Sequence, residues 1–470
     1  MVEAGGDKTA AKFHGTTIIQ SATMTSADNE NKTNETAVQL GFAVEFENDE
    51  HRMLVGHNSP LWQHWDGGQL GGKPSWLNPK DIPTNHLTCK CCSDPLVFVC
   101  QLYCPCDDIT PNAFHRSFYV FACPNNKCGK ETTGTIRVIR AQLPEDNPYL
   151  PEEEDECWAM HIPESWEVNI CKVCGQRGNG KCSVQGEHFC GRHHQKEYKK
   201  HVFDKNHKSS NDKDSLFMPS VLTSSELVVE EEPPYGKDAK SEAKSGSTMF
   251  KSGDLDDDDS DEEFDRNLEQ GDLNEMTGAG PETVTKDIVT MNFYDRINKI
   301  PNVNTQCLRY LRWPDKEQCR ETVSPLWIRS DYTPNDEDIP SCERCGAERR
   351  FEFQLMPQML HYLLKDHQME RSKQKSQNII NKKDTEAVRA ASTILEQAPP
   401  EQVPPDLAST TEKAVEAARA KIMEGGGNVP NWGGVSVYTC TSSCGGTDVI
   451  EGEELGAYIE EFAWKQASLD

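Results

Sequence analysis

The chain is 470 residues long, only 35% of it is hydrophobic, and its formal net charge is −28. This length allows about three domains, and a mean hydropathy of −0.72 predicts that a sizeable part is linker rather than packed core. An acidic chain is a poor general nucleic-acid binder, because it repels phosphate. It suits a basic partner, which it could shield electrostatically, although solubility alone also explains such a charge.

The cysteines indicate metal rather than disulfides. The chain has 19 of them, a number that in a secreted protein would suggest a disulfide framework. However, residues 1–34 are polar, without the apolar segment of a signal peptide, and no run approaches the length of a transmembrane helix. We therefore expect a reducing compartment, in which paired cysteines are usually metal ligands.

The first predicted strands cover residues 38–42 and 44–46, where β-forming residues alternate after a polar tail. A stretch rich in tryptophan and glycine follows, with Trp62, Trp65 and Trp76 around two Gly-Gly pairs. Glycines at this density indicate tight turns or close backbone approach. We expect these tryptophans to be core residues, with a peptide-docking surface as the alternative.

A cysteine pattern then begins with a C-x2-C pair, Cys89 and Cys92. Gln101-Leu102 starts nine residues after Cys92, and a predicted strand, Phe118–Phe121, leads into the looser pair Cys123 and Cys128. Another alternating strand is predicted at Ile136–Arg140.

A second kind of cluster follows an acidic connector and contains Cys171, Cys174, Cys182, Cys190, His194 and His201. A returning strand is predicted near Leu227–Val229. Residues 230–286 are low in complexity and carry the acidic run Asp254–Glu263, whose like charges cannot pack together.

The first cysteine pattern recurs in the last third of the chain. Cys342 and Cys345 form the C-x2-C pair, and Gln354-Leu355 again starts nine residues after the second cysteine. The looser pair, Cys440 and Cys444, comes after an interruption whose alanine-rich composition predicts helices. One module used twice explains this self-similarity.

Zinc is the physical reason for such a pattern, because a structural zinc ion takes four thiolate or imidazole ligands in a tetrahedron. Ordinary buried thiols are the alternative. We predict two structural zinc sites, formed by Cys89, Cys92, Cys123 and Cys128, and by Cys342, Cys345, Cys440 and Cys444.

The predicted fold class is α+β, mainly β, with two related zinc-braced modules. The expected divisions are a disordered tail (1–36), a first module (37–165), a zinc finger (166–208), a returning strand (209–230), an acidic linker (231–288), a second module (289–366 and 430–470) and a helical or disordered insertion (367–429). The sequence leaves open whether the two modules pack as one body.

Several blocks along the ordered chain resemble the programmed cell death protein 2 family. They are LGGKPSWL at 70–77, QLY at 101–103, AFHR at 113–116, RAQLP at 140–144, DIP at 338–340, FQLMPQ at 353–358 and EFAWKQ at 461–466. The resemblance implies that the cluster at 171–201 is a MYND-type zinc finger, which binds two zinc ions.

The first ligand set of such a finger is complete here, as Cys171, Cys174, Cys190 and His194. The second set departs from the family pattern. Cys182 and His201 match, but Gln185 and Lys205 stand where cysteines are expected. His188, His193 or His207 could replace them, or the second ion could be absent.

The resemblance also implies a chaperone-like role in small ribosomal subunit biogenesis, in which the protein binds one newly made basic ribosomal protein, in cytoplasm and nucleus. The alternative is a nuclear adaptor that recruits transcription or chromatin factors through the finger. We expect no enzyme, because H-E-x-x-H, P-loop and G-x-S-x-G motifs are missing from the sequence.

Overall fold

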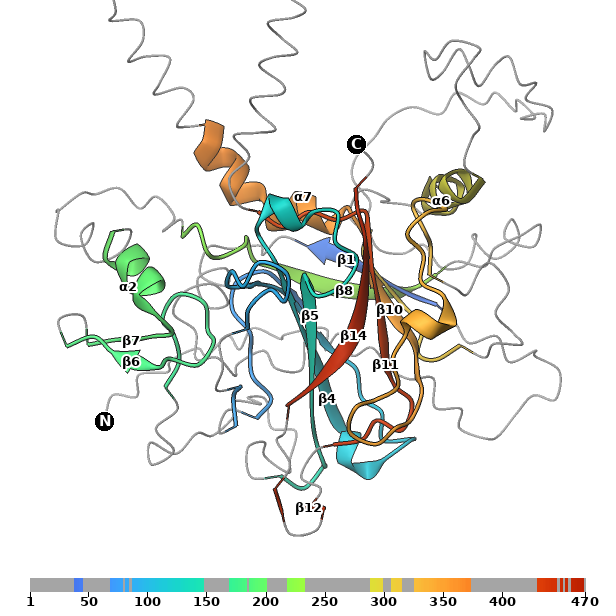
Figure 1. Ribbon diagram of the computed structural model, residues 1–470, viewed down its shortest axis with the longest axis horizontal. Coiled ribbons are helices and arrows are strands. Elements are labelled where there is room, and N and C mark those ends of the chain that lie inside the picture. The colour runs from blue at the N-terminus through green and yellow to red at the C-terminus, as the bar shows by residue number, and fades with distance from the viewer. Residues whose placement is uncertain are drawn as a thin grey trace, which may run out of the picture.

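The structure is a computed structural model (Figure 1). It describes residues 38–44, 68–78, 81–83, 87–147, 169–183, 186–200, 218–232, 288–298, 306–314, 325–372, 429–445, 449–450, 453–454 and 458–468. Several predicted features lie outside these ranges: residues 373–428 of the insertion, the acidic run at 254–263, and Trp62 and Trp65.

The described strands form one closed barrel, in the spatial order β1-β8-β2-β3-β4-β5-β14-β11-β10-β9. Their bounds are β1 Gln39–Val44, β2 Gly68–Leu70, β3 Val97–Tyr103, β4 His115–Ala122, β5 Ile136–Leu143, β8 Ser225–Glu231, β9 Gln306–Tyr310, β10 Arg349–Leu355, β11 Gly434–Cys440 and β14 Tyr458–Gln466. All neighbouring strands are antiparallel. The predicted β-rich class is confirmed.

Shorter elements surround the barrel. They are the hairpins β6–β7 (Gly180–Lys181 and His188–Phe189) and β12–β13 (Val449–Ile450 and Glu453–Glu454), the helices α2 (Arg192–Tyr198), α6 (Ile288–Asn298) and α7 (Met359–Leu363), and the 3-10 turns η2 (Pro111–Ala113), η3 (Asn126–Cys128) and η7 (Asp336–Asp338). Residues 365–372 form a further helical segment.

The predicted internal repeat is visible in the pairing of the strands. In β3 and β4, Gln101 lies opposite Tyr119, after a bulge between Phe98 and Cys100. In β10 and β11, Gln354 lies opposite Ser436, after a bulge at the same distance from the glutamine. The two glutamines also make equivalent hydrogen bonds. The side-chain oxygen of Gln101 accepts the backbone N–H of Ser75, and that of Gln354 accepts the backbone N–H of Leu326.

The barrel therefore has two equivalent halves. The first half comprises β8, β2, β3, β4 and β5, and the second comprises β1, β9, β10, β11 and β14. β1 precedes the first half in sequence but pairs with β8 on one side and β9 on the other. The two halves are thus not separate modules but share one sheet, which closes where β1 meets β8 and where β5 meets β14.

Apolar side chains from both halves fill the barrel. Phe118, Val120, Leu308, Phe353 and Val437 are all fully buried in this interior cluster. Burying one such side chain contributes about 1.5–3 kcal/mol. β3 and β4 are buried on both faces, because a second apolar layer covers the outside of the first half.

Trp76 anchors this second layer. Its ring stacks on Phe121 at 6.1 Å and lies 4.7 Å from Tyr119. Its indole N–H donates to the carbonyl of Gly175, at 2.7 Å, in the cysteine and histidine finger. The expectation that Trp76 is a core residue is confirmed, and this core extends to the finger, which lies at the left of Figure 1.

A buried ion pair crosses the barrel from one half to the other. The Arg116 guanidinium donates to both carboxylate oxygens of Glu352, at 2.6 and 2.8 Å, and both side chains are fully buried. Tyr310 and Thr439 also donate to this carboxylate. Burial alone would raise the pKa of Glu352, but the Arg116 charge and these hydrogen bonds hold it below its ordinary value.

Candidate metal centres

Cys89, Cys92, Cys123 and Cys128 come together beside the first half of the barrel. All four sulfur atoms lie within 4.8 Å of one another, with 4.0 Å between Cys89 and Cys128 and 3.6 Å between Cys92 and Cys123. A tetrahedral ion with metal–sulfur bonds of about 2.3 Å places its sulfurs about 3.8 Å apart. These four residues therefore fit such an ion.

The second half repeats this site with Cys342, Cys345, Cys440 and Cys444. The sulfur atoms of Cys342 and Cys444 are 3.5 Å apart, as are those of Cys345 and Cys440. Cys440 is the last residue of β11, and Cys123 directly follows the last residue of β4. The two equivalent strands therefore place equivalent cysteines at the two sites. The two cysteine groups that the spacing predicts thus have a similar arrangement of sulfur atoms.

The third group lies in the finger, where the β6–β7 hairpin and α2 meet. Cys174 and Cys190 have their sulfurs 3.8 Å apart, and His194 Nδ1 lies 3.0 Å from the Cys190 sulfur. Cys171 completes the group at 3.6 Å from the same nitrogen. Each of the three groups thus offers four ligand atoms, which is the full set of a structural tetrahedral site.

One backbone turn presents the leading cysteine pair in all three groups. The N–H of the first cysteine donates five residues ahead, from Cys89 to Asp94, Cys171 to Gln176 and Cys342 to Ala347. The residue after each second cysteine has a positive φ: 64° at Ser93, 71° at Gly175 and 75° at Gly346. Glycine suits this conformation, and Ser93 adopts it in the first half.

Each half also supplies a basic side chain to the other half's cysteine loop. Arg140 on β5 donates to the carbonyl of Cys444 at 2.7 Å. Lys465 on β14 donates to the carbonyls of Cys128 and Gly129 at 2.8 and 3.0 Å. Burial lowers the pKa of Lys465, and the neighbouring cysteine sulfurs act in the opposite direction.

The predicted second ligand set of the finger is not assembled among the described residues. Cys182 accepts a hydrogen bond from Gln195 at 3.1 Å and belongs to no group of candidate ligands there. His201 and His207 lie outside the described ranges. His193 lies 3.6 Å from Glu197, and with it forms a fourth candidate group that reuses His194.

The remaining described cysteines join none of the three four-ligand groups. Cys104 and Cys106 are buried, and neither belongs to a group of candidate ligands in the described part of the chain. Burial raises the pKa of both, and raises that of Cys307 to about 12. Cys100 is likewise buried, Cys91 is exposed, and Cys157 and Cys319 lie outside the described ranges.

The sequence missed the basic residues that bind the cysteine loops. Lysine is rarely buried, and Lys465 directly follows the apolar residues FAW in the segment EFAWKQ. A charged residue in such a segment is the sequence feature that could have indicated a buried interaction.

Among the described helices, none is long and apolar enough to cross a bilayer.

Comparison with known proteins gives matches at both ends of the barrel sequence. The family model for the programmed cell death protein 2 N-terminal domain matches residues 37–157. The model for the C-terminal putative domain of the same protein matches residues 287–394. Residues 158–286 lie outside both matches, so the MYND identity of the finger stays a prediction.

Curated relatives match across nearly the whole chain. Programmed cell death protein 2 from Bos taurus is 26% identical, over 86% of this chain and 91% of the relative. The Mus musculus protein of that name is 26% identical over 92% and 97%. Mus musculus programmed cell death protein 2-like is 25% identical over 64% of this chain and 80% of its own length.

No solved structure matches. The two family models nevertheless match strands from each half of the barrel, and relatives of one name align with 86% and 92% of the chain. The chain belongs to the programmed cell death protein 2 family.

Proposed function

We propose that zinc occupies the three groups of four ligands and that its role there is structural. Thiolate-rich tetrahedral sites favour zinc among the common divalent ions. When bound, the ion supplies a cross-link between loops and no open coordination position. The backbone turns beside Cys89, Cys171 and Cys342 would hold the first ligands of the three sites.

We further propose that the protein is a non-enzymatic, chaperone-like factor of small ribosomal subunit biogenesis. Its client would be one newly made, basic small-subunit ribosomal protein, bound in the cytoplasm and the nucleus. The observation that carries this proposal is the charge, with 77 acidic residues against 49 basic ones. Such an excess steers and shields a basic client that has not yet met RNA.

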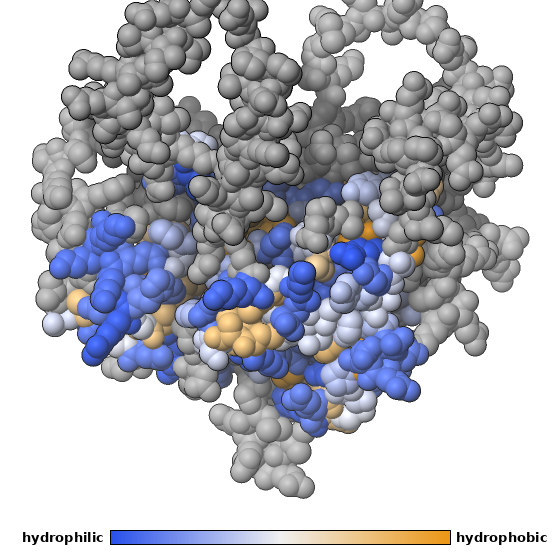
Figure 2. All heavy atoms as spheres, turned by 45° about the horizontal axis from the view of Figure 1, so that its top comes forward, coloured by the Kyte–Doolittle hydropathy of each residue, from blue (hydrophilic) through white to orange (hydrophobic). Residues whose placement is uncertain are grey.

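The surface of the described part offers both polar and apolar contacts. Figure 2 shows a mainly hydrophilic face with small apolar areas between the polar ones. The acidic excess of the whole sequence suits a basic protein better than it suits nucleic acid.

Affinity purification of the tagged full-length protein, with stringent washing and quantitative mass spectrometry, tests the proposal. We expect a single small-subunit ribosomal protein at near-equal abundance. A chain that retains transcription or chromatin factors, and no ribosomal protein, would contradict it. Washing at rising salt should release the client progressively, because exposed charges are screened.

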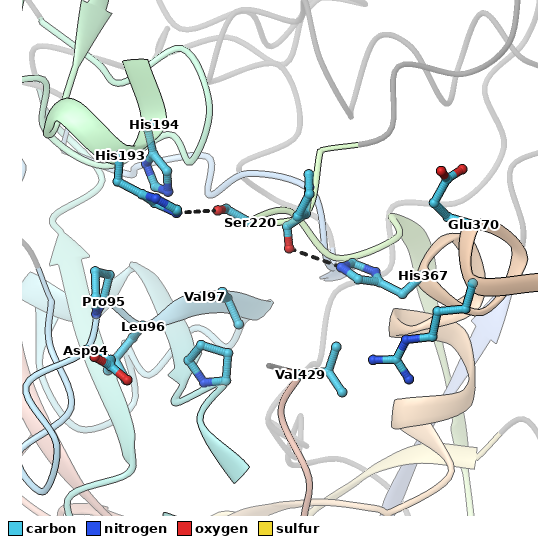
Figure 3. Close-up of a pocket in the computed structure, with 13 residues that line it drawn as sticks. Asp94, Pro95, Leu96, Val97, His193, His194, Ser220, His367, Glu370 and Val429 are labelled. Atoms are coloured by element: carbon cyan, nitrogen blue, oxygen red, sulfur yellow. Dashed lines mark hydrogen bonds between the residues drawn. The ribbon is translucent and has the colours of Figure 1, made fainter. Parts of the chain in front are cut away.

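The alternative, an adaptor that acts through the finger, has one observation in its favour. A cavity of about 550 Å³ lies between the finger, the loop before β3 and the helical segment 365–372 (Figure 3). His193 and Ser220 lie 3.3 Å apart at one wall, and His367 lies 3.1 Å from the carbonyl of Pro219 at another. A short peptide segment could enter such a space.

Replacing Cys171 and Cys174 with serine separates the two functions. The adaptor function should be lost, whereas the client should stay bound if the barrel carries it. Loss of the ribosomal protein in this variant, with the barrel still folded, would place the client on the finger instead.

A further inference from the structure

The outer face of the first half carries an aromatic pair that other parts of the chain cover. Phe98 on β3 lies opposite Phe121 on β4, with ring centroids 5.5 Å apart. Trp76 stacks on Phe121 and is hydrogen-bonded to the finger through Gly175. Gln176 of the finger adds two contacts, accepting from the N–H of Leu87 and donating to the carbonyl of Leu96. The finger therefore sits on this face.

The equivalent face of the second half is covered by other parts of the chain. Its aromatic pair is buried in a cluster with Leu40 and Leu311, and Ile339, which follows η7, packs against this cluster. Phe351 and Tyr438 occupy the positions of Phe98 and Phe121, opposite each other and 6.1 Å apart. Two rings of β14 follow: the Phe462 ring centroid lies 6.1 Å from that of Tyr438, and the Trp464 ring centroid lies 6.5 Å from that of Phe462. We call Phe351, Tyr438, Phe462 and Trp464 the aromatic row.

The row is open at its β14 end. Phe462 and Trp464 are half-buried, and Tyr332, whose carbonyl accepts the Trp464 indole N–H at 2.6 Å, is 54% exposed. In Figure 1, β10, β11 and β14 lie on the opposite side of the barrel from the finger. An exposed tyrosine fixed beside half-buried rings leaves a surface that a partner can cover.

Carboxylates border this surface. Asp336, Glu337 and Asp338 form η7 and are all exposed. Burial and the nearby Asp336 carboxylate both raise the pKa of the Tyr438 hydroxyl. The nearby cations are already paired, Arg329 with Asp331, Arg349 with Glu461, and Arg350 with Glu348.

Aromatic rings beside carboxylates favour guanidinium groups. Arginine stacks on aromatic faces and donates to carboxylates in one geometry, whereas lysine offers only a point charge. The surface already holds one such contact, since the Arg329 guanidinium lies 5.5 Å from the Tyr332 ring centroid. An acidic or purely apolar partner would leave these carboxylates facing like charge or poorly solvated.

We propose that the β14 end of the aromatic row, together with Tyr332 and η7, binds an arginine-bearing extended segment of a basic partner protein, on the face equivalent to the one the finger covers. This inference rests on the proposed function and places the client's contact on the second half of the barrel.

The test compares two triple variants of the full-length chain. The first combines Tyr332→Ala, Asp336→Asn and Glu337→Gln. The matched control combines Tyr294→Ala, Asp146→Asn and Glu145→Gln, which removes the same groups from exposed positions on α6 and after β5. Thermal unfolding establishes that both variants fold.

The probe is a fluorescein-labelled peptide of alternating arginine and serine, followed by fluorescence anisotropy. We expect the first variant to bind it roughly tenfold more weakly than the natural chain, and the control within about twofold. The same peptide with lysine should bind the natural chain more weakly than the arginine form. Equal binding by both variants would overturn the inference.

Affinity purification with the same variants keeps this inference separate from the proposed function. If the natural chain and the first variant retain the ribosomal protein equally, the assigned surface is wrong and the proposed function stands. If the natural chain retains none, the proposed function fails. If the first variant instead converts a dimer to a monomer in sedimentation, the face binds a second copy of the chain, and the inference is overturned.

Discussion

Arg140 and Lys465 occupy equivalent positions in the two halves of the barrel, and each donates to a cysteine loop of the other half. Arg140 lies opposite Phe118, five residues before Cys123, and Lys465 lies opposite Val435, five residues before Cys440. Arg140 reaches Cys444, and Lys465 reaches Cys128. The stability of each of the two candidate metal sites beside the barrel therefore depends on the half that does not contain it.

Replacing Lys465 with Met should weaken the first metal site without touching a ligand. The variant leaves the carbonyls of Cys128 and Gly129 without their cationic donor, so the free energy of unfolding should fall by about 1.5–3 kcal/mol. Metal release to a chromogenic chelator should accelerate at one site of three. Lys181→Met, at an exposed position, is the control. Unchanged release from Lys465→Met would show that the loop holds its ligands alone.

Replacing Glu352 with Gln should break the buried ion pair and leave Arg116 as an uncompensated buried charge. We expect a loss of about 3–5 kcal/mol in the free energy of unfolding, measured by chemical denaturation. The double variant Arg116→Met/Glu352→Gln should recover much of this loss. If the double variant is as unstable as the single one, the pair contributes packing rather than charge.

The same pair predicts a pH dependence. The folded pKa of Glu352 is lower than its unfolded value of about 4.3. Its stabilising contribution is therefore complete above the unfolded pKa and is lost as pH falls through the folded pKa. The natural chain should lose stability below about pH 4 more steeply than Glu352→Gln. Parallel stability profiles for the two proteins in that window would contradict this assignment.

Metal content gives a direct count of the sites. With three four-ligand groups described, native mass spectrometry should find three zinc ions for each chain. Cys345→Ser should remove one, and so should Cys174→Ser. A fourth ion, lost on replacing Cys182, would show that the finger has the second site for which the sequence retains only part of the ligand set.

Replacing Trp76 with Phe should loosen the finger from the barrel. The phenyl ring keeps part of the packing on Phe121 but cannot donate to Gly175, so limited proteolysis should cut within residues 158–200 sooner. Trp432→Phe loses a similar indole hydrogen bond, to Met356 inside the barrel, and serves as the control. Equal cleavage of both variants would mean that Trp76 stabilises the fold generally.

Spacing predicted the two barrel ligand groups, because each combines a C-x2-C pair with a looser cysteine pair that follows a predicted strand or resumes the module. The finger group came from the family resemblance. The sequence pattern also predicted the strands around Phe118 and Ile136. It could not predict that β1 pairs with β8 and β9, since such pairing links positions nearly 190 and 270 residues apart. The Arg116 and Glu352 pair was equally hidden, because neither residue shows its partner in the local pattern.

The placement of β1 and β14 affects how the protein can be made. β5 pairs with β4 on one edge and with β14 on the other. β1 can pair only after β8 and β9 have been synthesised. A ribosome must therefore synthesise β14 before the first half has both of its neighbours, and until then the edges of β5 and β11 can pair wrongly. A protein that we propose shelters an unfinished client is itself exposed to aggregation until β14 leaves the ribosome.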